Sequence, residues 1–241
     1  MRMGEILSLL RHEARTLRSL IRRRAFISSG QEADIVSRFH KLYYDATLID
    51  QTWDRTFWLG TRTMKCPLDL WVYQEIIHER RPDLIIETGT ESGGSALYLA
   101  CVCDLVQRGR VITVDIEDKE GRPRHPRVQY LLGSSISEEV VAQVRGQVGD
   151  RDTVMVILDS DHTRDHVLEE LRLYSGFVTP GSYLIVEDTN VNGHPVYPEF
   201  GPGPMEAVDV FLKEHRQFVV DKSREKFYMT FNPKGYLRRV G

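Results

Sequence analysis

Carboxylates gather directly after two apolar segments of this sequence. Asp159, Asp161 and His162 follow the segment TVMVIL, and Glu187 and Asp188 follow the segment SYLIV. Clustered carboxylates repel one another unless a positive charge lies among them. Oxygen ligands at this density favour Mg²⁺, Mn²⁺ or Ca²⁺, and zinc suits the cluster less because it holds no cysteine and one histidine. The residue types therefore predict a divalent-metal site.

A metal in this cluster would bind two vicinal oxygens of an acceptor. It would lower the pKa of the attacking hydroxyl and fix its direction. His162, three residues after Asp159, would then accept the proton. The alternative is that these residues cap local structure, with Asp161 and Asp165 at the next helix and Asp188 or Asn190 at the next turn. Capping needs one acid at each strand end rather than a pair, so metal binding is the favoured hypothesis.

A second group of polar residues forms a glycine-rich loop after an earlier apolar segment. The loop reads ETGTESGGS over residues 87–95, and Asp115 ends the next apolar segment. Glycines let the backbone approach a ligand, a helix N-terminus offers free N–H groups, and a strand-end acid can accept both hydroxyls of a ribose. Taken alone, the loop is also typical of a tight turn between a strand and a helix. Loop and acid together predict a ribose-containing cofactor.

The spacing of the glycines separates this loop from that of dinucleotide-binding folds. Those folds use G-x-G-x-x-G to hold a pyrophosphate, whereas this loop is E-x-G-x-x-x-G-G-S. An acid at its start suits a cationic cofactor without phosphate. A nucleotide-sugar dehydrogenase or epimerase would also need a Tyr-x-x-x-Lys pair, and neither Tyr183 nor Tyr197 has a lysine four residues later. The sequence therefore argues against that class of enzyme.

An alternation of apolar segments with helical segments positions these residues. It predicts an α/β fold: a doubly wound, mostly parallel, seven-stranded sheet with helices on both faces. The last two strands have no long helix between them, so we expect a hairpin that puts one antiparallel strand in the sheet. Strands are predicted at 83–87, 110–115, 128–132, 153–159, 182–188, 217–221 and 226–231, and helices at 67–82, 93–106, 138–148, 164–174 and 205–215.

The N-terminal region differs in character from the rest. Residues 2–24 combine seven arginines with apolar residues at helical spacing, which predicts a basic amphipathic helix. This helix either attaches to an anionic membrane surface or packs on its own domain or a second subunit. Residues 32–62 are aromatic-rich and are expected to form short helices and loops over one end of the sheet. We therefore divide the chain into a helical extension, 1–62, and a sheet domain, 63–241.

Composition narrows the class of protein. The 241 residues carry a net charge of −3, which gives no indication of nucleic-acid binding. No apolar stretch reaches the roughly 20 residues that a membrane-spanning helix needs. The three cysteines lack metal-ligand spacing and fit a reducing compartment. We expect a cytoplasmic protein, membrane-associated if residues 2–24 bind lipid, that forms a homo-oligomer and acts on a small molecule.

Several motifs resemble the rhamnosyl O-methyltransferase and cephalosporin hydroxylase family of class I methyltransferases. They are HKLYYD, MKCPLDLWVYQEI, IIETGTESGGSALYLA and LDSDHTRDH, and the likeness covers residues 38–240. It implies an O-methyltransferase that uses S-adenosyl-L-methionine (SAM) with Mg²⁺ or Mn²⁺. The implied acceptor is a hydroxyl of rhamnose or a related deoxysugar on a glycolipid or glycosylated natural product. The alternative is a non-catalytic SAM-binding partner of a cephalosporin-hydroxylase-like oxidation and methoxylation system.

The resemblance also implies roles for individual residues, as does a likeness to catechol O-methyltransferase and metal-dependent sugar O-methyltransferases. His162 would be the general base. Asp159, Glu187 and Asp188 would be the metal ligands, with Asp161 as a rival first ligand. The implied cofactor-binding residues are Glu87, Gly89, Thr90, Gly93, Ser95, Asp115, Ser134, Ser135 and Asp159.

A segment rich in proline and glycine, NVNGHPVYPEFGPGP, follows the second pair of acids. We expect it to form a wall of the acceptor pocket, where His194, Tyr197 and Phe200 would contact the sugar, because aromatic faces suit the C–H side of a pyranose. His194 is also the second candidate for the base. The alternative is a rigid loop that only covers the sheet edge. By resemblance, Met64 and Lys65 would close over the cofactor.

Overall fold

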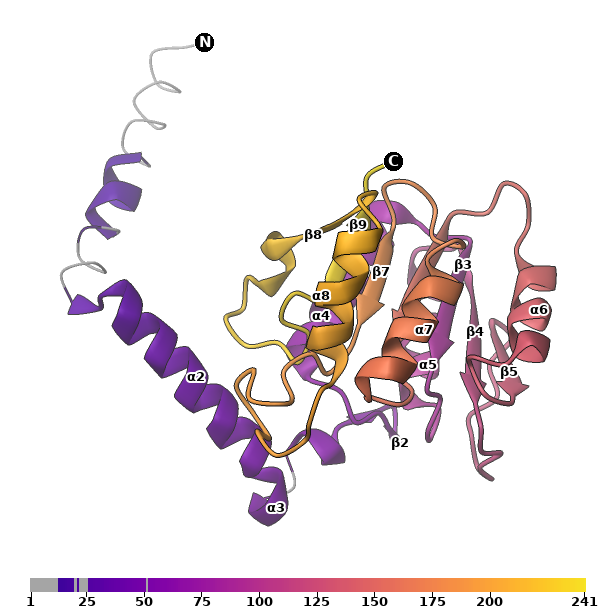
Figure 1. Ribbon diagram of the computed structural model, residues 1–241, viewed down its shortest axis with the longest axis horizontal. Helices are drawn as coiled ribbons and strands as arrows, with labels where there is room; N and C mark the ends of the chain where they lie inside the picture. The colour runs from indigo at the N-terminus through magenta and orange to yellow at the C-terminus, as the bar shows by residue number, and fades with distance from the viewer. Residues whose placement is uncertain (1–12, 20, 22–25, 51) are drawn as a thin grey trace, which may run out of the picture.

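The structure, a computed structural model, describes residues 13–19, 21, 26–50 and 52–241. Its centre is a seven-stranded sheet with the order β5-β4-β3-β6-β7-β9-β8 (Figure 1). The strands are β3 (Leu84–Thr88), β4 (Arg110–Asp115), β5 (Val128–Leu132), β6 (Val154–Leu158), β7 (Tyr183–Val186), β8 (Phe218–Val220) and β9 (Tyr236–Arg239).

Strand directions match the predicted fold class. Strands β3 to β7 are parallel, and β9 pairs antiparallel with both β7 and β8. The predicted seven-stranded sheet with one antiparallel strand is confirmed. From β3 the chain passes to β4 on one side and later to β6 on the other. The carboxyl ends beside β3 therefore form the switch point at which such sheets bind ligands.

The position predicted for the last strand was wrong. We expected it at 226–231, but β9 is Tyr236–Arg239. The buried carboxylate of Asp69 explains the difference, because it accepts hydrogen bonds from Thr230 Oγ1 (2.5 Å) and the Phe231 N–H (2.8 Å). The backbone N–H that Phe231 would give to a neighbouring strand is thus taken by Asp69 on helix α4.

Helices cover both faces of the sheet. They are α4 (Pro67–Arg80), α5 (Gly94–Leu105), α6 (Glu138–Gln147), α7 (Arg164–Tyr174) and α8 (Pro204–Glu214). Side chains of β3 alternate between two apolar cores, since Leu84 and Ile86 pack with α6, α7 and α8 while Ile85 packs with α4 and α5. Burial on both faces makes each strand an apolar run, and polar residues begin where the strand ends.

The N-terminal segment differs from the expected short helices and loops. Helix α2 (Ser29–Asp45) is 17 residues long and begins with a capping box formed by Ser28 and Gln31. Its amino-terminal end extends beyond the sheet domain (Figure 1). After it come α3 (Thr47–Asp50), the 3₁₀ helix η1 (Trp53–Arg55), β1 (Phe57–Trp58) and β2 (Thr61–Arg62). The carboxyl-terminal part of α2 and η1 dock on the sheet domain through a small aromatic core at Phe231.

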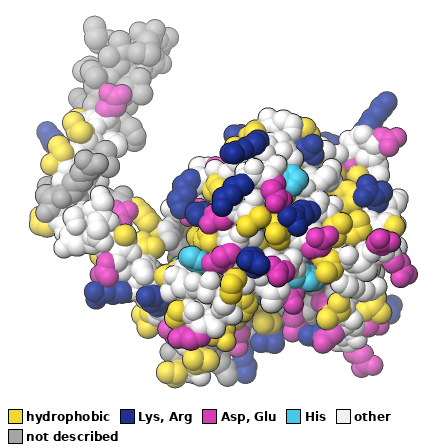
Figure 2. Space-filling view, viewed as in Figure 1, with side chains coloured by type: hydrophobic (Ala, Val, Ile, Leu, Met, Phe, Trp, Pro, Cys, Tyr) yellow, Lys and Arg dark blue, Asp and Glu magenta, His cyan; other side chains and the backbone are white. Residues whose placement is uncertain are grey.

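The predicted basic helix at 2–24 lies largely outside the described residues. Residues 13–19 are helical, while 1–12, 20 and 22–25 are not described. Membrane attachment, oligomer formation and the boundary at 62 stay predictions. Among the described residues no helix has the length and hydropathy to cross a membrane. On the face of α6, α7 and α8, basic and acidic side chains are interspersed (Figure 2).

Candidate functional site

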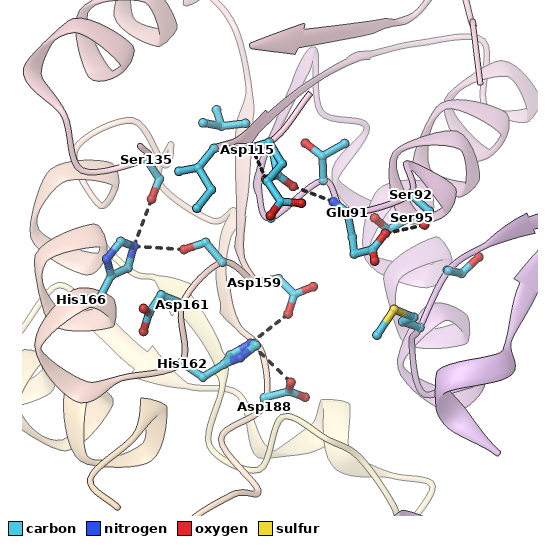
Figure 3. Close-up of a pocket in the computed structure, with 18 of the residues that line it drawn as sticks. Glu91, Ser92, Ser95, Asp115, Ser135, Asp159, Asp161, His162, His166 and Asp188 are labelled. Carbon is cyan, nitrogen blue, oxygen red and sulfur yellow. Dashed lines mark hydrogen bonds and ion pairs between the residues drawn. The ribbon is translucent and has the colours of Figure 1, made fainter. Parts of the chain in front are cut away.

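A cavity of about 670 Å³ opens at the carboxyl ends of β3, β4, β6 and β7 (Figure 3). It joins the glycine-rich loop, the acid cluster and the proline-rich segment, which are far apart in sequence. The predicted residues that line it are Met64, Gly89, Thr90, Ser95, Asp115, Ser134, Ser135, Asp159, Asp161, His162, Asp188, Tyr197 and Phe200. Five predicted residues do not line it: Lys65, Glu87, Gly93, Glu187 and His194.

The glycine-rich loop is packed against the end of β6. A Cβ atom at Gly89, where φ is +84°, would lie 1.8 Å from the carbonyl oxygen of Asp159. Gly93 has a φ of +80° and is the residue before helix α5. Glycine is therefore required at both positions, at Gly89 by close approach and at both by backbone conformation. The loop leaves the N-terminus of α5 facing the cavity, as a bound ligand would require.

Glu87 lies beneath this loop. Its side chain is fully buried, and one carboxylate oxygen accepts a hydrogen bond from Thr113 Oγ1 at 2.7 Å. The other oxygen, Oε1, has no hydrogen-bond partner among the described residues. Burial raises the pKa of this carboxyl, although the nearby Lys65 ammonium opposes the rise. A buried carboxylate with a free lone pair next to a cavity suits a cationic ligand.

Asp115 is held rigidly at the cavity. Its two oxygens accept hydrogen bonds from the backbone N–H groups of Glu91 (2.7 Å) and Glu117 (2.9 Å), and Arg122 lies 3.2 Å away. The side chain remains partly accessible. A fixed carboxylate at the end of the second strand is the arrangement that accepts the hydroxyls of a ribose.

His166, from α7, also lines the cavity and was missed by the sequence analysis. Its Nε2 atom lies 3.2 Å from Ser135 Oγ and 3.1 Å from Ser160 Oγ, and the fully buried Glu170 is 3.7 Å away. The interaction with Glu170 is the largest influence on the pKa of His166 and raises it. The i, i+4 spacing of His166 and Glu170 on the predicted helix is the feature of the sequence that could have identified this cluster. This cluster fixes Ser135, one of the predicted cofactor residues.

The acid cluster converges on one histidine, as the dashed lines of Figure 3 show. His162 Nε2 is 3.2 Å from Asp159 Oδ1 and 3.3 Å from Asp188 Oδ2. One ligand atom from each of the three residues lies within 4.8 Å of the others. Burial alone would lower the pKa of His162, but Asp188 and Asp159 outweigh it and raise the pKa to about 9. The three side chains are close enough to surround a single cation.

Lys65 lies behind this cluster, almost fully buried at 3% exposure. Its ammonium group donates to Asp159 Oδ2 and, at 2.5 Å, to Glu187 Oε1. The structure thus brings Asp159 and Asp188 together around His162 and directs Glu187 to Lys65. Burial opposes ionisation of Asp159, yet Lys65 and His162 keep its pKa below the usual value. We expected Lys65 to close over the cofactor, whereas its ammonium group contacts Asp159 and Glu187.

The donor set fits a hard divalent cation. If all four ionised, the carboxyl groups of Glu87, Asp159, Glu187 and Asp188 would carry more negative charge than Lys65 and His162 can balance. Burial and the charge of Asp159 accordingly raise the pKa of Glu187 and Asp188. Carboxylate oxygens at this density are compatible with Mg²⁺ or Mn²⁺.

Asp161 behaves differently from its neighbours. It is exposed, and its Oδ1 accepts the backbone N–H of Thr163 at 2.7 Å. The N-cap residue of α7 is Thr163, so this bond is an Asx turn just before the helix, and Asp161 does not occupy the capping position that the alternative hypothesis gave it. The geometry therefore favours Asp159 over Asp161 as the first metal ligand.

The proline-rich segment contributes Tyr197 and Phe200 to the cavity, with ring centroids 5.5 Å apart. His194 is bonded instead to Glu206, at 2.8 Å. Burial would raise the pKa of Glu206, but hydrogen bonds from His194 and backbone groups hold it at about 2. Tyr44 and Trp53, from the N-terminal segment, line the same cavity. Neither residue was predicted to line the pocket, although the sequence around both is rich in aromatic residues.

Comparison with known proteins places the chain in a family. Residues 50–240 match the family model for rhamnosyl O-methyltransferase/CmcI. The rhamnosyl O-methyltransferase of Mycobacterium leprae is 39% identical over 211 residues, which cover 85% of this chain and 90% of that protein. That of Mycobacterium tuberculosis is also 39% identical, over 212 residues and 85% of both chains.

Solved structures agree on the fold. An apo structure of CmcI has a TM-score of 0.58 and 23% identity, covering 78% of this chain and 77% of that one. A structure of CmcI with Mg and SAM has a TM-score of 0.60 and 20% identity, covering 78% of each chain. The chain belongs to the rhamnosyl O-methyltransferase/CmcI family and has the class I methyltransferase fold.

Proposed function

We propose that this methyltransferase transfers a methyl group from SAM to a hydroxyl of rhamnose or a related deoxysugar, carried by a glycolipid or a glycosylated natural product. The observation that carries the proposal is the convergence of Asp159, His162 and Asp188 beside the glycine-rich loop. A methyl donor and an ionisable acceptor hydroxyl would meet at this point. The names of the mycobacterial relatives support a rhamnosyl acceptor.

The cofactor would occupy the part of the cavity nearest β3 and β4. Asp115 would accept the ribose hydroxyls, while Ser134 and Ser135 would flank the adenine. Gly89, Thr90, Gly93 and Ser95 would form the loop that lets the backbone approach the methionine part, and the buried Glu87 would hold its positive charge. These residues orient the sulfonium methyl toward the acid cluster, which is what an in-line displacement requires.

Asp159, Glu187 and Asp188 would hold a Mg²⁺ or Mn²⁺ ion. When bound, the ion would lower the pKa of an acceptor hydroxyl and orient it. Glu187 is adjacent in sequence to Asp188 and shares the Lys65 ammonium group with Asp159.

His162 would accept the proton of the acceptor hydroxyl through Nε2. That nitrogen faces Asp159 and Asp188 in the cavity, at the place where the acceptor oxygen would lie. The same carboxylates raise the pKa of His162. Neutralising them with a divalent cation would lower it and so favour the neutral imidazole that a base requires.

The test is methyl transfer from SAM to a panel of rhamnosylated, fucosylated and glucosylated acceptors in the presence of Mg²⁺. We expect a rhamnoside to gain one methyl group on a sugar oxygen, identified by mass spectrometry and NMR. SAM binding without methylation of any sugar would contradict the proposal. That result would favour a different acceptor or a non-catalytic SAM-binding partner.

A further inference from the structure

We propose that Tyr44 and Trp53 form a wall of the acceptor pocket and bind the apolar face of the sugar ring. This inference rests on the proposed function, and it assigns part of the acceptor site to the N-terminal segment rather than to the sheet domain. Tyr44 belongs to α2 and Trp53 to η1, more than 100 residues before the acid cluster. Both line the same cavity as Asp159, His162 and Asp188.

The two rings form one rigid unit. Their centroids are 5.3 Å apart with an interplanar angle of 22°, so the rings are stacked. The indole N–H of Trp53 donates to the backbone carbonyl of Tyr44 at 3.1 Å. This hydrogen bond occupies the polar group of the indole and leaves its carbon surface for contact with a ligand. Stacked rings fixed in this way lose little conformational entropy when a ligand binds.

The buried ring of Phe231 packs against both Tyr44 and Trp53. Phe231, 4% exposed, contacts both rings edge to face at centroid distances of 5.8 Å. Its own backbone N–H is bonded to Asp69, and its carbonyl accepts the N–H of Asn190 at 3.2 Å. Asn190 begins the segment that carries Tyr197 and Phe200. One buried residue therefore fixes Tyr44 and Trp53 relative to the segment that bears the other aromatic residues of the cavity.

The hydroxyl of Tyr44 adds a polar group to this wall. Burial raises the pKa of Tyr44 to about 12, with further contributions from the charge of Asp188 and from Tyr197. The phenol is therefore protonated at neutral pH and can donate a hydrogen bond to an acceptor oxygen. An aromatic surface with one donor beside the acids matches a pyranose, which has an apolar C–H face and a ring of hydroxyls.

A neighbour on the same helix provides a matched control. Tyr43 also contacts Phe231, at a centroid distance of 6.1 Å, but does not line the cavity. The experiment compares Tyr44→Leu, Trp53→Leu and Tyr43→Leu with the wild type. It measures the acceptor KM and kcat, the SAM dissociation constant by calorimetry without acceptor, and the thermal unfolding midpoint. Tyr44→Phe isolates the contribution of the hydroxyl.

We expect Tyr44→Leu and Trp53→Leu to raise the acceptor KM about tenfold with the SAM dissociation constant unchanged. Tyr43→Leu should lower the unfolding midpoint without changing the KM, and Tyr44→Phe should give a smaller rise than Tyr44→Leu. An unchanged KM in both cavity variants would overturn the inference. So would an equal rise in Tyr43→Leu, since it would show general loosening of the aromatic core.

A binding experiment separates this inference from the proposed function. Saturation-transfer NMR measures the binding of a methyl rhamnoside to the protein in the presence of S-adenosylhomocysteine. Binding that is weaker in both cavity variants supports the aromatic wall even if the wild type does not methylate this sugar. Failure of the wild type to bind any glycoside would overturn the inference. Turnover of the rhamnoside by variants with normal KM would overturn the inference and leave the proposed function intact.

Discussion

The two halves of the cavity differ in their residue types and in the part of the fold that carries them. The half that we propose for the cofactor and metal consists of residues at or just after the carboxyl ends of parallel strands, such as Gly89, Asp115 and Asp159. The half that we propose for the acceptor consists of aromatic residues outside the sheet, with Tyr44 and Trp53 before it and Tyr197 and Phe200 after β7. Strand ends are fixed by the ladders of the sheet, whereas connecting segments are fixed by side-chain contacts. Enzymes with different acceptors could therefore use the same first half, while the second half could differ from one enzyme to the next.

Charge also separates the halves. The first half buries several carboxylates against Lys65 and His162, which is costly without a further cation. The second half gains its order from ring contacts around Phe231. Substitutions in the first half should therefore abolish chemistry while sparing acceptor affinity, and substitutions in the second should do the reverse.

The largest effect is expected for Asp159→Ala. This carboxylate contacts both Lys65 and His162. Its loss removes a metal ligand and should lower kcat/KM by about 10³-fold, because a metal supplies several kcal/mol of transition-state stabilisation. Asp161→Ala is the matched control, since that carboxylate bonds to the Thr163 N–H. Methyl-transfer kinetics in which Asp161→Ala is the more damaging change would make Asp161 the ligand.

His162→Gln should produce the next largest effect. Removal of a general base typically lowers the rate by about 10² to 10⁴-fold. We expect the loss in kcat, with the SAM dissociation constant and the acceptor KM close to those of the wild type. His194→Gln provides the comparison, because His194 is bonded to Glu206 and does not line the cavity. A larger fall in kcat for His194→Gln would reverse the assignment of the base.

A smaller effect is expected in the acceptor half for Phe200→Leu. The ring of Phe200 contacts Tyr197 and lines the cavity. Loss of an aromatic contact costs about 0.5–1.5 kcal/mol, so the acceptor KM should rise about two- to tenfold with kcat nearly unchanged. Steady-state kinetics with a varied acceptor measure this change. A fall in kcat with an unchanged KM would place Phe200 with the chemical half.

The packing of α2 on the sheet domain should weaken at low pH, and this effect concerns stability rather than activity. His40 is buried, stacks on Phe231 at 5.9 Å, and lies 3.2 Å from Asn190 Nδ2. Burial lowers its pKa from 6.5 to about 4. The unfolded chain therefore binds the proton more readily, and the stabilisation is complete above pH 6.5 and is lost as the pH falls toward 4.

Urea unfolding at pH 7 and pH 4.5 tests this dependence. Protonation of His40 in the unfolded chain should lower the free energy of unfolding of the wild type by about 2 kcal/mol between these two pH values. His40→Gln should show a weaker fall in the free energy of unfolding between the two pH values. An identical fall in wild type and variant would show that His40 does not couple the N-terminal segment to pH.

The same division explains what could be predicted from the sequence. A strand buried on both faces ends where its apolar run ends, so the acids at 159 and 187–188 could be placed at one sheet edge. The alternating pattern at 226–231 failed as a strand because Asp69, more than 150 residues away, binds Thr230 and Phe231.

Other features depend on tertiary contacts that leave no local pattern. Nothing near Lys65 in sequence indicates its contacts with Asp159 and Glu187. The aromatic residues at 44 and 53 read equally well as ordinary core. Their position in the cavity depends on Phe231 at the far end of the chain. Residue types in the acceptor half therefore suggested a pocket without showing which rings form it.

The most direct test of the account is methyl transfer by the wild-type enzyme after removal of divalent metal. The protein is stripped with EDTA, assayed with SAM and a rhamnosylated acceptor, and then supplied with increasing Mg²⁺ or Mn²⁺. The account predicts that product formation stops with EDTA and returns as either metal saturates the site. Full activity in EDTA, with SAM bound, would contradict it and leave Asp159, Glu187 and Asp188 as structural acids.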